Sequence, residues 1–143
     1  LYQSTSPEKF ATLFYALLDP IRHELVYCNA GQEHPYLTGA DGKVRRLDKG
    51  GVALAMFESF PFEEDRLTME PGDLLLVASD GISEAMDTGM GQFGDDRLGA
   101  VIREHRERPA AELIELIIAA VRTHAGSAPQ TDDMTLLAVR RTA

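Results

Sequence analysis

Two short acidic motifs contain the residues of this chain best suited to chemistry. Asp80 stands between a serine and a glycine, at the end of the apolar run Leu74–Ser79. Asp132 and Asp133 directly precede a second apolar run, Met134–Val139. If the two runs are antiparallel neighbours in a sheet, the end of one meets the start of the other, and the carboxylates converge at one edge. Facing carboxylates repel unless a cation lies between them, and Mg²⁺ and Mn²⁺ prefer oxygen ligands.

The motifs therefore indicate a divalent-metal site. The alternative interpretation is structural, because Ser-Asp-Gly is a common turn sequence and an Asp-Asp pair before a strand is often a solvated loop.

The segments between the motifs predict a sheet-rich fold. We predict strands over Phe10–Leu18, Leu25–Cys28, Pro35–Thr38, Lys43–Leu47, Asp65–Met69, Leu74–Ser79 and Met134–Val139, with a tight turn at Asp41-Gly42 and a loop at Gly50-Gly51. Phe10–Leu18 is apolar on both faces, which predicts a strand covered on both sides, paired as a hairpin with Leu25–Cys28.

Two helices are predicted between the motifs. The first begins near Asp95-Asp96, either of which could cap it, and the second has Pro109 near its first turn and Gly126 as its stop. Many strands, then two helices, then one strand indicate an α+β fold, with an antiparallel sheet layered with helices, and not alternating βαβ units.

Charge and composition restrict the partners. The 143 residues suit one domain and carry a formal net charge of −9, which argues against nucleic acid and anionic membranes. No apolar stretch approaches the ~20 residues of a membrane helix. The single cysteine, Cys28, is expected to be a small buried hydrophobic residue, and a cytoplasmic location fits best. An acidic protein that handles phosphate needs another source of positive charge, and a divalent metal supplies it.

Other motifs are given structural interpretations. The pattern Gly89-x-Gly91-x-x-Gly94 matches a dinucleotide fingerprint by letter, but no strand directly precedes it, so we predict a mobile loop. The four histidines show no metal-ligand spacing. The pairs Arg45-Arg46 and Arg140-Arg141 are too sparse for a nucleic-acid patch, although one of them could contact a substrate phosphate.

Five segments in order resemble the PPM-type metal-dependent protein phosphatases, in the bacterial branch typified by sporulation stage II protein E and the stress regulator RsbU. They are Phe10–Tyr15, Asn29–Gly31, Leu76–Ala85, Gln92–Gly94 and Asp132–Thr135. The resemblance runs over nearly the whole chain and implies an antiparallel β-sandwich flanked by helices (αββα). It also implies that Asp80 and Asp132 are catalytic metal ligands, and that Asp133 binds a metal or supports its ligands.

The resemblance further implies the reaction. Two Mn²⁺ or Mg²⁺ ions about 3.5–4 Å apart would activate a water that attacks the phosphorus of phosphoserine or phosphothreonine. The implied substrate is a regulatory protein, an anti-sigma-factor antagonist. The rival hypothesis is a non-catalytic pseudophosphatase that binds a partner.

The chain also departs from the family pattern. Gln32 follows Asn29–Gly31 where relatives usually have His, which we interpret as variation near the site. The family's N-terminal acidic motifs, including an Asp before Gly-His-Gly that bridges the two ions, are not found. Residues 1–143 are therefore expected to be the C-terminal portion of a single phosphatase domain with half a metal site. Such a fragment should be inactive alone and, with uncovered apolar faces, could form a homodimer.

Overall fold

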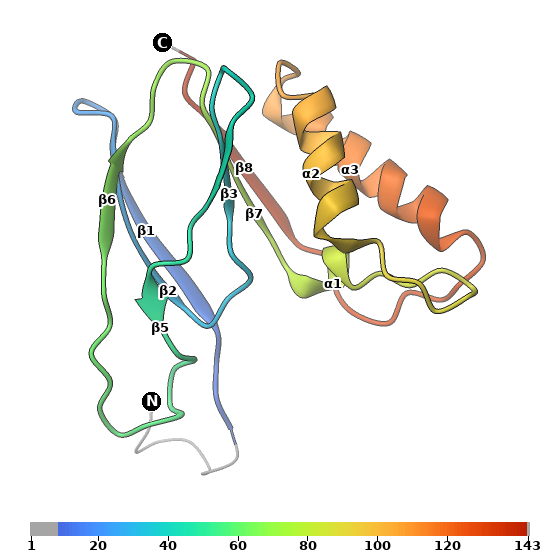
Figure 1. Ribbon diagram of the computed structural model, residues 1–143, viewed down its shortest axis with the longest axis horizontal. Helices are drawn as coiled ribbons and strands as arrows, with labels where there is room; N and C mark the ends of the chain where they lie inside the picture. Colours follow the sequence, from blue (N-terminus) through green and yellow to red (C-terminus); the bar gives the residue numbers. More distant parts are fainter. Residues whose placement is uncertain (1–8, 143) are drawn as a thin grey trace. The chain divides into compact units, whose positions relative to one another are not determined.

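The computed structural model describes residues 9–142 and divides the chain into two compact units. The first contains Leu1–His34 and Leu47–Met69, and the second contains Pro35–Arg46 and Glu70–Ala143. Each unit has its own sheet, and all helices belong to the second unit (Figure 1). The predicted α+β class is confirmed. Within the described range, no helix is both long and apolar enough to span a membrane.

The sheet of the first unit is built on a hairpin. Its strands are β1 (Leu13–Asp19), β2 (Glu24–Ala30), β5 (Gly50–Gly51) and β6 (Asp65–Thr68). β1 and β2 are antiparallel with Asp19 opposite Glu24, which confirms the predicted hairpin. The carboxylate of Asp19 shapes the turn by accepting hydrogen bonds from the backbone N–H of Ile21 and Arg22, at 2.8 and 2.9 Å. β6 pairs antiparallel with the same central strand, β2.

The structure corrects two predictions in this sheet. β1 is not covered on both sides, because Tyr15 and Leu17 are 62% and 61% exposed. β1 lies at the edge of its sheet and pairs only with β2 among the described strands. An apolar run expresses a preference for burial, whereas burial itself needs a partner surface. The second correction is that Gly50 and Gly51 form strand β5, parallel to β2. A Cβ at Gly50 would overlap the backbone of Asn29, so glycine here permits close strand approach.

The sheet of the second unit carries both acidic motifs. Its strands are β3 (Tyr36–Thr38), β4 (Val44–Arg46), β7 (Leu74–Ala78) and β8 (Leu136–Arg140), in the order β4-β3-β7-β8, and every pair is antiparallel. Leu74, Leu76 and Ala78 alternate along β7 and are buried on one face. The predicted last strand, Met134–Val139, is shifted two residues toward the C-terminus at its start.

Three helices accompany this sheet. They are α1 (Asp80–Ser83), α2 (Gly94–Glu104) and α3 (Ala110–Ala125), of which α1 was not predicted. α2 and α3 lie side by side, and their buried faces join the β7 residues in one hydrophobic core (Figure 1). The core residues of α2 and α3 are Leu98, Ile102, Leu113, Ile117 and Val121, whose spacing follows one face of each of these two helices.

The ends of α3 and the start of α2 match the prediction, but the predicted cap of α2 does not. Pro109 is the residue before α3, and Gly126 ends it with φ of 59°. α2 begins at Gly94, and neither Asp95 nor Asp96 caps it. The carboxylate of Asp95 instead accepts a hydrogen bond from the Tyr36 hydroxyl at 2.7 Å and forms an ion pair with Arg46 at 3.1 Å. This interaction ties the start of α2 to strands β3 and β4.

Arg140 anchors the last strand through backbone carbonyls. Its guanidinium donates hydrogen bonds to the carbonyl oxygens of Gly72, Arg106 and Arg108. Burial lowers the pKa of Arg140, and both of its terminal nitrogens donate to backbone carbonyls and not toward a substrate phosphate. The suggestion that an arginine of this pair contacts phosphate is therefore not supported for Arg140.

Replacing Arg140 by Met is expected to lower the free energy of unfolding by about 2–3 kcal/mol, since three carbonyls lose a charged donor. Urea unfolding measures the change. Arg103→Met, at an exposed position near the end of α2, is the matched control and should change stability by less than about 0.5 kcal/mol. Equal losses for the two variants would contradict this role for Arg140.

Candidate metal centre

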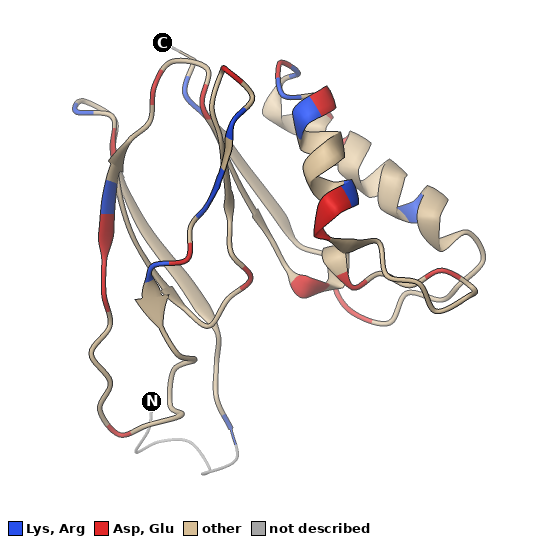
Figure 2. Cartoon of the chain, in the orientation of Figure 1, with Lys and Arg blue, Asp and Glu red and all other residues tan. Residues whose placement is uncertain are grey.

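The pairing of β7 with β8 brings the two acidic motifs together. In the register of this pair Leu74 faces Arg140 and Ala78 faces Leu136, so the end of β7 meets the start of β8. The contact continues beyond the strands, because the Ser79 N–H donates to the Thr135 carbonyl at 3.0 Å. The antiparallel pairing on which the metal-site hypothesis depended is therefore present. Acidic residues consequently gather around α1 and the loop that leads into β8 (Figure 2).

The Ser79 hydroxyl links the two motifs directly. It donates a hydrogen bond to the carbonyl oxygen of Asp133 at 3.0 Å and accepts one from the N–H of Thr135 at 2.9 Å. One side chain thereby satisfies two backbone groups on either side of Met134. The conformation of the loop that carries Asp132 and Asp133 depends on this bridge.

Gly81 lets the loop approach closely. The residue is buried in α1, and a Cβ added to it would overlap the Asp133 carbonyl oxygen. The same Cβ would lie 3.0 Å from the Asp133 carbonyl carbon and 3.4 Å from that of Asp132. Backbone atoms cannot yield as the end of a flexible side chain can. Only glycine fits between α1 and the acidic loop.

The three candidate ligands are exposed to solvent, and two of them accept a hydrogen bond from the backbone N–H of the next residue. Asp80, Asp132 and Asp133 all have exposed side chains. One carboxylate oxygen of Asp80 accepts the Gly81 N–H at 3.0 Å, and one of Asp132 accepts the Asp133 N–H at 2.7 Å. Each of these aspartates keeps a second carboxylate oxygen for a ligand. Within residues 9–142, no group of three or more His, Cys, Asp or Glu side chains is arranged to hold a metal.

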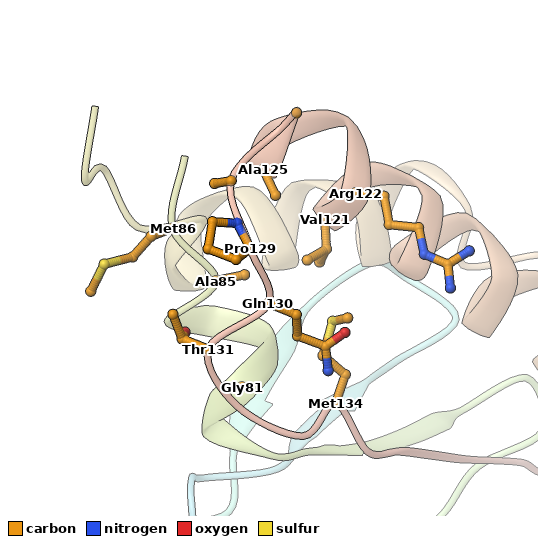
Figure 3. Close-up of a pocket in the computed structure, with 12 residues that line it drawn as sticks. Gly81, Ala85, Met86, Val121, Arg122, Ala125, Pro129, Gln130, Thr131 and Met134 are labelled. Atoms are coloured by element: carbon orange, nitrogen blue, oxygen red, sulfur yellow. The ribbon is translucent and has the colours of Figure 1, made fainter. Parts of the chain in front are cut away.

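A cavity of about 280 Å³ lies beside the same loop. Gly81 forms part of its wall, together with Val121 and Ala125 from α3 and with Pro129 and Gln130 from the loop (Figure 3). The Gln130 side-chain amide also donates to the carbonyl oxygen of Asp132 at 2.8 Å. The cavity wall and the acidic loop are therefore one connected structure.

The other sequence motifs have structural roles. Asp87 accepts the backbone N–H groups of Gly91 and Gly89, each at 2.8 Å, and these bonds lower the pKa of its carboxyl group. The glycine-rich segment is thus a turn built around a carboxylate, which would repel a pyrophosphate. Cys28 is half-buried, somewhat less than expected, and burial raises the pKa of its thiol.

Ser79 and Gln130 were not predicted as site residues. Ser79 directly precedes Asp80 in the Ser-Asp-Gly motif, so its hydroxyl was available as a signal. Gln130 offered no signal, since its contact with the Asp132 carbonyl depends on the loop conformation.

Ser79→Ala is expected to destabilise the protein by about 1–2 kcal/mol, because the Asp133 carbonyl and the Thr135 N–H lose their shared partner. Thermal unfolding measures the effect. The control is Ser83→Ala, whose hydroxyl makes only a 3.3 Å hydrogen bond to the Asp80 carbonyl within the same helical turn. If the two variants unfold at the same temperature, the Ser79 bridge does not hold the loop.

Comparison with known proteins identifies the family. The family model for stage II sporulation protein E (SpoIIE) matches residues 1–142. The chain therefore belongs to the SpoIIE family, the SpoIIE/RsbU-like branch of the PPM phosphatases, as the sequence motifs implied.

Two curated proteins are similar to the chain. Protein IcfG from Synechocystis sp. is 31% identical over 132 residues, covering 92% of this chain and 21% of IcfG. Phosphoserine phosphatase RsbU from Bacillus subtilis is 27% identical over 140 residues, covering 97% of this chain and 41% of RsbU. The chain thus spans less than half the length of these two relatives.

Two solved structures share the fold at 25% identity. The SiaA-PP2C domain of Pseudomonas aeruginosa matches with a TM-score of 0.79, over 90% of this chain and 51% of that one. The RsbU and RsbW domains of Rv1364c from Mycobacterium tuberculosis match with a TM-score of 0.77, over 92% of this chain and 37% of that one.

Proposed function

We propose that this chain is part of a metal-dependent protein phosphatase that hydrolyses phosphoserine or phosphothreonine. The observation that supports this most is the contact of Gly81 with the backbone of Asp132 and Asp133, because it joins two carboxylate-bearing motifs at adjacent strand ends. Membership of the SpoIIE family gives that contact a chemical meaning.

The residues present fit a hard divalent cation. Asp80 and Asp132 are exposed carboxylates on connected segments, and oxygen is the donor atom that Mn²⁺ and Mg²⁺ prefer. We assign these two as metal ligands, with Asp133 as a ligand or a support for one. A bound pair of such ions supplies a water of lowered pKa and offsets negative charge on phosphoryl oxygens. Ser79 and Gly81 hold the ligand-bearing loop in place.

The proposed substrate is a phosphorylated regulatory protein. RsbU of Bacillus subtilis is named a phosphoserine phosphatase, and Rv1364c combines an RsbU domain with an RsbW domain. We extend the first activity to this chain and propose an anti-sigma-factor antagonist as the substrate. The net charge of −9 agrees with a substrate that is bound through metal ions and not through clustered cations.

We further propose that the 143 residues are the C-terminal portion of one phosphatase domain. Coverage of 51% of the SiaA-PP2C domain supports this, as does the finding that residues 9–142 contain no assembled group of three metal-binding side chains. The remaining metal ligands would come from a segment outside the chain.

The test compares the 143-residue chain with a form extended upstream to the length of the relatives. Each is assayed on para-nitrophenyl phosphate and on phosphoserine peptides, with Mn²⁺ or Mg²⁺ and with a chelator. Metal-dependent hydrolysis by the extended form alone is expected. Robust hydrolysis by the short form would show that the ligands are misassigned. No hydrolysis by either would favour a non-catalytic module that binds a partner.

A further inference from the structure

We propose that the cavity beside Gly81 receives one apolar side chain of the phosphorylated substrate protein, a few residues from its phosphoserine. This inference rests on the proposed phosphatase function. The cavity has a volume of about 280 Å³. Sites for drug-sized ligands and cofactors usually hold about 300–1,000 Å³, so this cavity lies just below that range and has room for one large side chain.

The lining of the cavity selects for an apolar occupant. Ala85, Met86, Val121, Ala125 and Met134 contribute aliphatic or thioether surface. Methionine side chains adapt to different apolar shapes, which suits a subsite that accepts Leu, Ile or Met. Among the described residues, no Asp, Glu, His or Cys lines the cavity, so its chemistry does not suit a metal ion.

The position of the cavity suits a side chain of the same protein that presents the phosphoserine. Gly81 belongs both to the cavity wall and to the contact with the acidic loop, and Gln130 lines the cavity while it hydrogen-bonds the Asp132 carbonyl. An occupant therefore lies next to the loop where the phosphoryl group is expected. An extended peptide advances about 3.3 Å per residue, so a side chain near the phosphoserine can reach the cavity.

Charge at the cavity supports the same occupant. Arg122 is the one charged residue that lines it, and its guanidinium has no hydrogen-bond or ion-pair partner in the described part of the chain. In a chain of net charge −9, an unpaired arginine beside an apolar cavity suits a substrate segment that combines an apolar residue with an acidic one.

The first measurement determines the affinity of the upstream-extended protein for a series of fluorescent peptides. Each peptide has a non-hydrolysable phosphonate analogue of phosphoserine in a Gly-Ser background, with one Leu moved through the four positions on either side. We expect Leu at one position to tighten binding about 10-fold. Equal affinity for Leu at every position would overturn the proposal, and this readout needs no variant and no turnover.

The second measurement fills the cavity. Ala125→Phe should abolish the Leu preference, so that the peptide with Leu at the favoured position binds no more tightly than the Gly-Ser peptide without Leu. Ala119→Phe places the same side chain on an exposed position of α3 and should keep the preference. Loss of the preference in both variants, or a full preference in Ala125→Phe, would overturn the proposal.

The two measurements also separate this inference from the proposed function. A protein that prefers Leu at one position but hydrolyses no phosphate would retain the cavity as a peptide subsite and refute the phosphatase assignment. A protein that hydrolyses phosphoserine peptides but binds the phosphonate series with no preference for Leu would retain the phosphatase assignment and refute the subsite.

Discussion

Asp80→Asn is expected to lower metal-dependent phosphatase activity at least ~100-fold in the extended protein. Asn keeps the shape of the side chain but loses the charge that holds a divalent cation. Residues that only support metal ligands already cost 10–100-fold when they are changed, so loss of a ligand should cost at least as much. The measurement is kcat/KM on a phosphoserine peptide over a range of Mn²⁺ concentrations.

The same change at other aspartates tests the assignment. Asp132→Asn should be as severe as Asp80→Asn, and Asp133→Asn should be milder. Asp96→Asn is the matched control, because Asp96 is exposed in the first turn of α2 and belongs to neither motif. It should retain wild-type activity. Wild-type activity in Asp80→Asn would remove Asp80 from the metal site.

Gly81→Ala is expected to displace the acidic loop and to remove most of the activity. The added Cβ would overlap the Asp133 carbonyl oxygen. The atoms that it would meet belong to the backbone of Asp132 and Asp133, which cannot move aside as easily as the end of a side chain. Overpacking of this kind typically costs about 1–3 kcal/mol of stability. Urea unfolding and Mn²⁺ titration of the same variant separate a loss of fold from a loss of metal binding.

A second glycine provides a control of opposite sign. Gly99 lies inside α2, where the nearest atom to an added Cβ is the end of the flexible Arg103 side chain, at 3.3 Å. Gly99→Ala should therefore stabilise the protein by about 0.5–1 kcal/mol, since alanine favours a helix interior. If Gly81→Ala were equally stabilising and fully active, the close approach would have no functional role.

Local patterns in the sequence predicted most of the second unit. The apolar run Leu74–Ser79 identified β7, and the helical spacing that ends at Gly126 identified α3. These features depend on neighbours in sequence, so they can be predicted without the fold. The predicted cap of α2 was wrong, because Asp95 pairs with Tyr36 and Arg46, which are distant in sequence.

The first unit shows where periodicity fails. A continuous apolar run predicted a strand buried on both faces, yet Tyr15 and Leu17 of β1 are exposed. The two glycines of β5 were interpreted as a loop, because the sequence cannot show that another strand passes close to Gly50. Both errors concern surfaces that distant segments provide.

For the candidate site, the sequence by itself determined which residue types are available and that two acidic motifs adjoin apolar runs. The order of five short segments along the chain was enough to indicate the family. The tertiary structure alone decided that β7 and β8 are neighbours, that Ser79 bridges Asp133 and Thr135, and that a cavity opens beside Gly81. The physical reason is that the strand pairing and the Ser79 bridge join residues more than fifty positions apart, and that the cavity wall combines Gly81 with side chains from α3 and the loop after it. Their distances follow from how the chain packs, and no local pattern encodes them.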